Sequence, residues 1–184
     1  GTEGFIGELM DLHMGPLMLL GPTKDPTIAA GISLRLPHLP LRIKAHSERA
    51  LAMTSRLQEL GLKVCYPGLP DHPDHKLFAE LHCDEYGYGG VFTLDVGDED
   101  KANALMSCLQ NEQRFGYLAV SLGYFDTLMS CSGSSTSSEL TEEDKASAGI
   151  SPGLLRISIG YTGTLEQRWT QLLAALRHTG LVPA

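Results

Sequence analysis

Several features that identify common classes of protein are missing from this sequence of 184 residues. No apolar run approaches the length of about 18 residues that suggests a membrane-spanning helix. Lysine and arginine total 14 against 22 aspartate and glutamate, which gives a net charge of −8 at pH 7, and no basic stripe stands out. Binding to a phosphate backbone relies on such a basic surface. The sequence therefore predicts neither a membrane span nor a nucleic-acid partner.

The sequence also lacks a disulfide pattern and a leader. Its four cysteines, Cys65, Cys83, Cys108 and Cys131, show no CxxC spacing. We predict free thiols in a reducing compartment, and hence a cytoplasmic location, because no basic and apolar leader opens the chain. Residues 1–4 contain no initiating methionine, which suggests a piece of a longer protein, whether natural, engineered or proteolytic.

The residues that are present predict helices and strands in alternation. A weak helix is expected over 26–36. A long one is expected over 41–60, where Met53, Leu57 and Leu60 recur at i, i+4 and i+7 before Gly61. Further strands are expected at 62–66, 91–96, 118–122 and 154–160. Further helices are expected at 73–81, after Asp98, at 141–149 and after Thr164. This order predicts a small α/β layer sandwich.

Histidines near the middle of the chain raise the possibility of a metal site. The candidate ligands fall within twelve residues: His72, His75, His82 and Cys83. Nitrogen and sulfur ligands suit zinc, but the spacing matches neither a zinc finger nor an HExxH motif. We favour a turn whose imidazoles cap a helix, and predict no metal site.

Other candidate motifs are weaker. The glycines of residues 87–90 precede a strand instead of opening a helix, so a turn or close backbone packing is more plausible than a phosphate cradle. The hydroxyl-rich segment 131–138 could bind an anion, and a loop that is simply exposed to solvent is an equally good interpretation. No GxSxG elbow supports a hydrolase triad.

Arg156 stands alone inside the apolar segment 154–159. An unpaired buried charge costs several kcal/mol, so this guanidinium needs a partner, and its planar fork suits a carboxylate. A structural salt bridge and exposure at a strand end remain open alternatives.

Five spaced segments carry a resemblance to a known family. They are LPLRIKAHSERA (39–50), YPGLPDHPDHKL (66–77), GGVFTLDV (89–96), AVSLGYFDTLMSCSGSST (119–136) and SAGISPGLLRISIG (147–160). In this order they resemble the C-terminal part of the Cys/Met-metabolism enzymes that depend on pyridoxal phosphate (PLP). LGPT (20–23), YGYGG (86–90) and SCSGSSTSSEL (130–140) are most similar to the plant-type methionine γ-lyases in that family.

The resemblance implies a fold and a domain division. It implies the C-terminal domain of a fold-type I PLP enzyme, an α/β (α+β) domain with a small, mostly antiparallel sheet of about four strands covered by helices. Residues 1–38 would be a remnant of the large domain and linker, 39–61 a connecting helix, and 62–184 the C-terminal domain. A tetramer is expected of the full-length protein, whereas the state of this chain alone is open.

The resemblance also implies functional residues. Arg156 would bind the α-carboxylate of a sulfur-containing amino acid. Ser121 would lie at the same edge, and Thr136 would help to order the site, although Ser137 replaces the histidine usual after it. In some family members the residue at the position of Asp126 influences the choice of substrate. We assign no role to Asp126 itself.

The Schiff-base lysine of the family lies upstream of residue 1 in the resemblance. Lys24 only mimics its motif, so we expect no catalytic residue in this chain, no covalently bound PLP and no lyase activity of the chain alone. The function implied for the whole protein is conversion of methionine to methanethiol, 2-oxobutanoate and ammonia. The alternatives are a cystathionine γ-synthase or γ-lyase, or a non-catalytic amino-acid-binding module.

Overall fold

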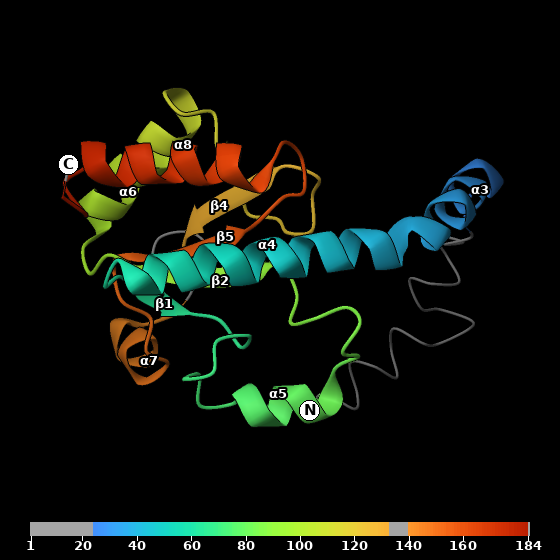
Figure 1. The fold of residues 1–184 in the computed structure, drawn as a ribbon, viewed down its shortest axis with the longest axis horizontal. Helices are drawn as coiled ribbons and strands as arrows, with labels where there is room; N and C mark the ends of the chain where they lie inside the picture. The colour runs from blue at the N-terminus through green and yellow to red at the C-terminus, as the bar shows by residue number, and fades with distance from the viewer. Residues whose placement is uncertain (1–23, 133–139, 184) are drawn as a thin grey trace, which may run out of the picture. The chain divides into compact units, whose positions relative to one another are not determined.

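A computed structural model describes residues 24–132 and 140–183 of the chain (Figure 1). It divides into two compact units, residues 1–39 and 40–184. In the described part of the first unit, helix α3 (Pro26–Arg35) is followed by a 3₁₀ turn, η1 (Leu36–His38). Asp25 caps α3, because its carboxylate accepts hydrogen bonds from the amides of Thr27 and Ile28 at 2.9 and 3.2 Å. None of the described helices is long and apolar enough to cross a membrane.

The second unit is a five-stranded sheet with helices, in the chain order α4, β1, α5, β2, α6, β3, β4, α7, β5, α8. The helices are α4 (Leu39–Glu59), α5 (His75–Leu81), α6 (Glu99–Asn111), α7 (Glu142–Ser147) and α8 (Leu165–His178). The strands are β1 (Lys63–Cys65), β2 (Val91–Asp95), β3 (Gly116–Leu118), β4 (Thr127–Cys131) and β5 (Leu154–Ser158).

The strands lie in the order β1-β2-β5-β4-β3, which puts the last strand of the chain at the centre of the sheet. All pairs are antiparallel except β3 with β4. The mostly antiparallel sheet expected from the resemblance is therefore confirmed. Central β5 is the strand that carries Arg156.

One face of the sheet forms the hydrophobic core together with helices. Strand residues on this face include Phe92, Leu94, Met129, Leu155 and Ile157, each at most 2% exposed. The covering residues come from α4, α6 and α8: Ala50, Met53, Leu57, Ala102, Leu105, Leu109, Leu172, Ala175 and Leu176. Figure 1 shows α6 and α8 lying together over this sheet, and both belong to the same core. Period-two alternation leaves the neighbouring strand residues on the opposite face.

The helix ends follow the predicted capping chemistry. Asp98 accepts a hydrogen bond from the Lys101 amide at 3.0 Å, and Thr164 accepts one from the Gln167 amide at 3.1 Å. Gly61 adopts a φ of 77°, a left-handed conformation that suits glycine after a helix end. These ends were predictable because each depends on residues within one turn.

The sheet differs from the strand-by-strand prediction in two places. Thr127–Cys131 forms a buried fifth strand that the sequence pattern does not predict. The predicted buried strand 118–122 is also wrong, since β3 ends at Leu118 and the side chains of Val120 and Leu122 are 67% and 60% exposed. The apolar residues of 118–122 face outward, so hydrophobicity alone misplaced the strand.

Candidate functional site

Arg156 lies at the middle of the central strand, on the face opposite the core. It pairs with Thr93 of β2 on one side and with Ser130 of β4 on the other. Directly paired residues of antiparallel strands point to the same face, so these three side chains form a polar row across the sheet. The strand neighbours Leu155 and Ile157 are fully buried on the other face. Alternation along one strand thus presents a guanidinium on the face away from the core.

The guanidinium of Arg156 holds the segment that connects β3 to β4. Its Nη2 donates a hydrogen bond to the main-chain oxygen of Ser121 at 3.2 Å. A second contact lies two residues further along both segments. There the Gly123 amide donates a hydrogen bond to Ser158 Oγ at 3.0 Å. Residues 119–126 are therefore tethered twice to β5. The structure brings Arg156 and Ser121 together, through the main chain of Ser121 and not through its hydroxyl.

Most of the donor capacity of Arg156 is unused within the described residues. A guanidinium carries five N–H donors, and the contact with Ser121 uses one of them. The side chain is only partly buried. This geometry leaves the planar fork available for a carboxylate, which can accept two parallel hydrogen bonds.

Ser130 is a polar residue of this face that the sequence analysis missed. It is 6% exposed, and its Oγ is buried without a hydrogen-bond partner among the described residues. It also borders a hollow of 260 Å³ between α6 and the start of the 119–126 segment. A buried hydroxyl without a partner costs about 1–3 kcal/mol, so its presence beside Arg156 needs an explanation. The alternation that reveals it becomes visible only once β4 is known to be a strand.

The other predicted site residues are placed as follows. Thr136 falls in 133–139 and lies outside the described residues. Asp126 forms an ion pair with Arg168 of α8 at 2.8 Å and also accepts a hydrogen bond from the Thr162 hydroxyl. Both charged side chains of the pair are largely buried, at 18% and 13% exposure. Asp126 thus anchors the end of the 119–126 segment to α8.

The histidines singled out by the sequence have local partners. His72 Nδ1 accepts from the Asp74 amide at 3.1 Å, just before α5. His75 and His82 stack on the ring of Tyr88, with centroids 5.2 and 4.4 Å away. Their Nδ1 atoms lie 2.7 and 3.0 Å from main-chain oxygens. These contacts support the interpretation as a turn and helix start.

The glycine-rich turn packs closely on α4, as predicted. A Cβ on Gly90 would lie 2.7 Å from His46 Cβ, and Gly89 has a φ of 83°. The Gly89 amide donates to Ser47 Oγ at 2.9 Å, and its oxygen accepts from the Tyr66 hydroxyl at 2.8 Å. Burial, with the neighbouring Tyr88 as a second cause, raises the pKa of Tyr66 far above its usual range. The hydroxyl is therefore a fixed donor at neutral pH.

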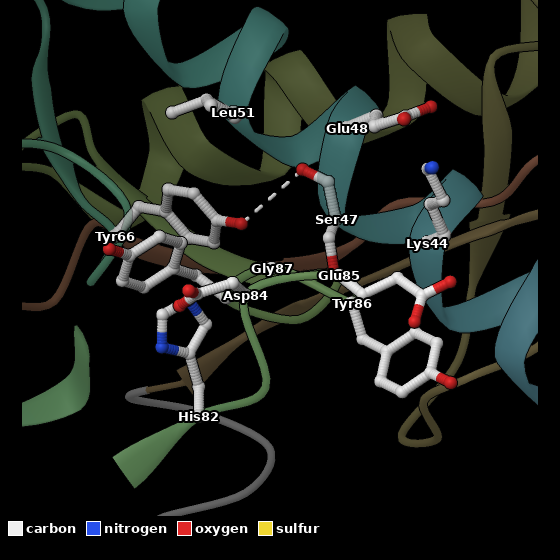
Figure 2. Close-up of a pocket in the computed structure, with 11 residues that line it drawn as sticks. Lys44, Ser47, Glu48, Leu51, Tyr66, His82, Asp84, Glu85, Tyr86 and Gly87 are labelled. Atoms are coloured by element: carbon white, nitrogen blue, oxygen red, sulfur yellow. Dashed lines mark hydrogen bonds and ion pairs between the residues drawn. The ribbon is translucent and has the colours of Figure 1, made fainter. Parts of the chain in front are cut away.

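A cavity of 340 Å³ opens beside this turn. Figure 2 shows it between α4, which contributes Lys44, Ser47 and Glu48, and the 82–88 segment. Neither Arg156 nor Ser121 lines it. The cavity and the polar face are therefore separate features of the second unit.

Comparisons with known proteins agree with one another. Residues 10–168 match the family model described as Cys/Met metabolism PLP-dependent enzyme. Over 171 residues, 93% of the chain, the sequence is 57% identical to a methionine γ-lyase of Arabidopsis thaliana. It is 33% identical over 84% of its length to an O-succinylhomoserine sulfhydrylase of Pseudomonas aeruginosa.

Solved structures that resemble this chain include enzymes of sulfur amino-acid metabolism. A cystathionine γ-synthase from Xanthomonas oryzae pv. oryzae, in complex with aminoacrylate and cysteine, superposes with a TM-score of 0.76. It is 32% identical, and the match covers 89% of this chain and 41% of that one. The chain spans 39% of the length of the Arabidopsis relative and 37% of the Pseudomonas one.

Proposed function

Because the chain belongs to the family of Cys/Met metabolism PLP-dependent enzymes, we propose that it supplies the carboxylate-binding part of a carbon–sulfur lyase acting on methionine. The observation that carries this proposal is the 57% identity to a methionine γ-lyase along 93% of the chain. Relatives that carry other activities, such as the cystathionine γ-lyases of Bacillus subtilis and Dictyostelium discoideum, are 30–34% identical. The proposed reaction converts methionine and water to methanethiol, 2-oxobutanoate and ammonia.

Arg156 has the leading role in this proposal. Its fork would bind the α-carboxylate of the amino acid by two charge-assisted hydrogen bonds. Fixing the carboxylate fixes the direction of the bonds at Cα, so the contribution of Arg156 is orientation and not bond breaking. The hydrogen bond to the Ser121 oxygen holds the guanidinium in place for this task. Ser130 Oγ, buried and without a hydrogen-bond partner in the described part of the chain, is a second candidate donor to the same ligand.

The polar face around Arg156 fits the substrate better than it fits the covalent attachment of the cofactor, because Arg156 pairs across the sheet with Thr93 and Ser130 and not with a lysine. PLP supplies an electron sink for charge that develops on the amino acid. Lys63 is the lysine of the described strands, and its Nζ is paired with Asp95 at 2.6 Å. A guanidinium and a hydroxyl suit an amino-acid carboxylate, whereas attachment of PLP needs a lysine that is free to react. We therefore assign carboxylate binding to this chain and derive no step through PLP from it.

The remaining assignments concern the whole protein. Thr136 would help to order the substrate site, as the family resemblance implies. A tetramer in the cytoplasm would be the working form. No disulfide joins the four cysteines Cys65, Cys83, Cys108 and Cys131, all of which lie in the described residues, and this suits a reducing compartment.

The test of this function is a substrate panel with the whole protein that contains this chain. Purified protein with PLP is given methionine, cystathionine or O-succinylhomoserine, and 2-oxobutanoate and methanethiol are measured. The proposal expects both products from methionine, with kcat/KM highest for that substrate. Turnover of cystathionine alone would instead assign a cystathionine lyase. Amino-acid binding by the 184-residue chain without PLP, with no turnover by the whole protein, would favour a binding module.

A further inference from the structure

Two helices of the core layer end side by side and bring together three side chains that can bind a metal. Cys108 lies in the last turn of α6, Glu112 caps that helix, and His178 is the last residue of α8. The ligand atoms of these three residues all lie within 4.8 Å of one another. We propose that Cys108, Glu112 and His178 form a binding site for a borderline-soft divalent cation, with Zn²⁺ as the best-matched ion.

The donor set and its spacing suit zinc. Cys108 Sγ lies 3.6 Å from Glu112 Oε2, and His178 Nε2 lies 3.9 Å from the same oxygen. In a tetrahedral site, bond lengths of about 2.3 Å to sulfur and about 2.0 Å to nitrogen or oxygen separate the ligand atoms by roughly 3.3–3.6 Å. Small side-chain rotations would therefore bring the ligand atoms to these separations. The side chains of His178 and Glu112 are 64% and 54% exposed, so they have room to rotate.

The two helices explain why the three ligands converge. Residues four apart on a helix lie on one face, which places Cys108 and Glu112 together. Helix α8 packs against α6 and delivers His178 from a distant part of the sequence. Both helices present their C-terminal ends here, where the helix dipole carries partial negative charge and favours a cation.

The proposed site lies at the border of the core, with one buried ligand, Cys108, and two exposed ones, Glu112 and His178. Cys108 is 3% exposed and donates its thiol hydrogen to Glu112, a proton that a metal ion would replace. Three protein ligands leave a fourth position for water. The bound ion would cross-link the ends of α6 and α8 on the side of the sheet away from Arg156.

Zinc titration of the full 184-residue chain tests the proposal, with calorimetry for stoichiometry and circular dichroism for the melting temperature. We expect one ion per chain and a higher melting temperature. Glu112→Gln and His178→Asn change exposed side chains and should leave folding intact. Because even outer-shell substitutions weaken metal sites by about 10–100-fold, each should lower zinc affinity by more than about tenfold.

Matched controls separate this site from adventitious binding. Glu80→Gln and His38→Asn alter exposed residues of the same types and should leave zinc affinity unchanged. With Co²⁺ as the probe, a near-ultraviolet thiolate-to-cobalt band should appear, survive in Cys83→Ser and vanish in Cys108→Ser. Absence of 1:1 binding, or equal affinity in Glu112→Gln, His178→Asn and the controls, would overturn the proposal.

Discussion

The two faces of the central sheet differ sharply although their residues alternate along the same strands. On β5, Leu155 and Ile157 are fully buried against helices, whereas Arg156 between them faces the opposite side and is only partly buried. The core face consists of large apolar side chains, and the polar face holds a guanidinium with a row of small hydroxyl residues. Large apolar side chains are thus concentrated on one face, and the groups that we propose for binding lie on the other.

Substitutions on the two faces should therefore have different effects, and the core face should give the largest loss of stability. Leu155→Ala removes a fully buried side chain from the middle of the core. Such substitutions lower the free energy of unfolding by about 2–5 kcal/mol. Urea unfolding of the 184-residue chain measures this. A loss as large from Arg156→Ala would contradict the division between a stabilising and a binding face.

The next largest effect should come from the ion pair that anchors the 119–126 segment. Arg168→Met leaves Asp126, which is 18% exposed, without its cation. A lost hydrogen bond to a charged group costs about 1.5–3 kcal/mol, and urea unfolding again provides the measurement. Arg177→Met changes an exposed arginine on the same helix and serves as the control. Equal stability of the two variants would show that the pair does not anchor the segment.

Two buried serines of the polar face should respond in opposite directions. Ser158→Ala removes the acceptor of the Gly123 amide and should cost about 1 kcal/mol of unfolding free energy. Ser130→Ala removes a hydroxyl without a partner among the described residues and should be neutral or stabilising by up to about 1 kcal/mol. Thermal unfolding compares them. A clear loss of stability in Ser130→Ala would mean that its hydroxyl has a structural partner.

The smallest effect should be a pH-dependent one at the edge of the polar face. Burial opposes ionisation of Asp95, but hydrogen bonds from Lys63 and Ser151 outweigh it and lower the pKa of its carboxyl below the usual 3.8. A lowered pKa stabilises the fold above the unfolded pKa, and this stabilisation is lost as the pH falls through the folded pKa. The melting temperature of Asp95→Asn should therefore fall below wild type at pH 7, and the gap should close below pH 3.8.

The control for that measurement is Asp84→Asn, because the Asp84 side chain is 98% exposed. A gap between wild type and Asp95→Asn that is the same at every pH would show that the carboxylate charge contributes nothing. If the melting temperatures of Asp95→Asn and Asp84→Asn depended on pH in the same way, the pairing of Asp95 with Lys63 would have no special role.

Helix ends and the central strand could be predicted from sequence because their causes are local. Asp98, Thr164 and Gly61 act within one turn of the helix that they cap. Arg156 could be identified as a candidate because it is a single charged residue among apolar ones. That pattern is visible in the sequence without knowledge of the strand order. The number of strands could not be predicted, because Thr127–Cys131 is buried along its whole length and shows no alternation between polar and apolar positions.

Features that depend on pairing between distant segments were not predictable. Ser130 gains significance only from its register opposite Arg156, 26 residues later in the chain. The cluster of Cys108, Glu112 and His178 exists only because α6 and α8 pack together, and no sequence motif joins its members. The histidines that did lie close in sequence, His72 and His75, form local contacts instead.

The most direct test of the central claim asks whether Arg156 recognises the carboxylate and nothing else. The whole protein with PLP is titrated with methionine and with methioninol, which has a hydroxymethyl group in place of the carboxylate, in wild type and Arg156→Ala. We expect the substitution to weaken methionine binding by about 10–100-fold, as for loss of a charged hydrogen bond, and to leave methioninol binding unchanged. Equal weakening of both ligands, or of neither, would contradict the assignment.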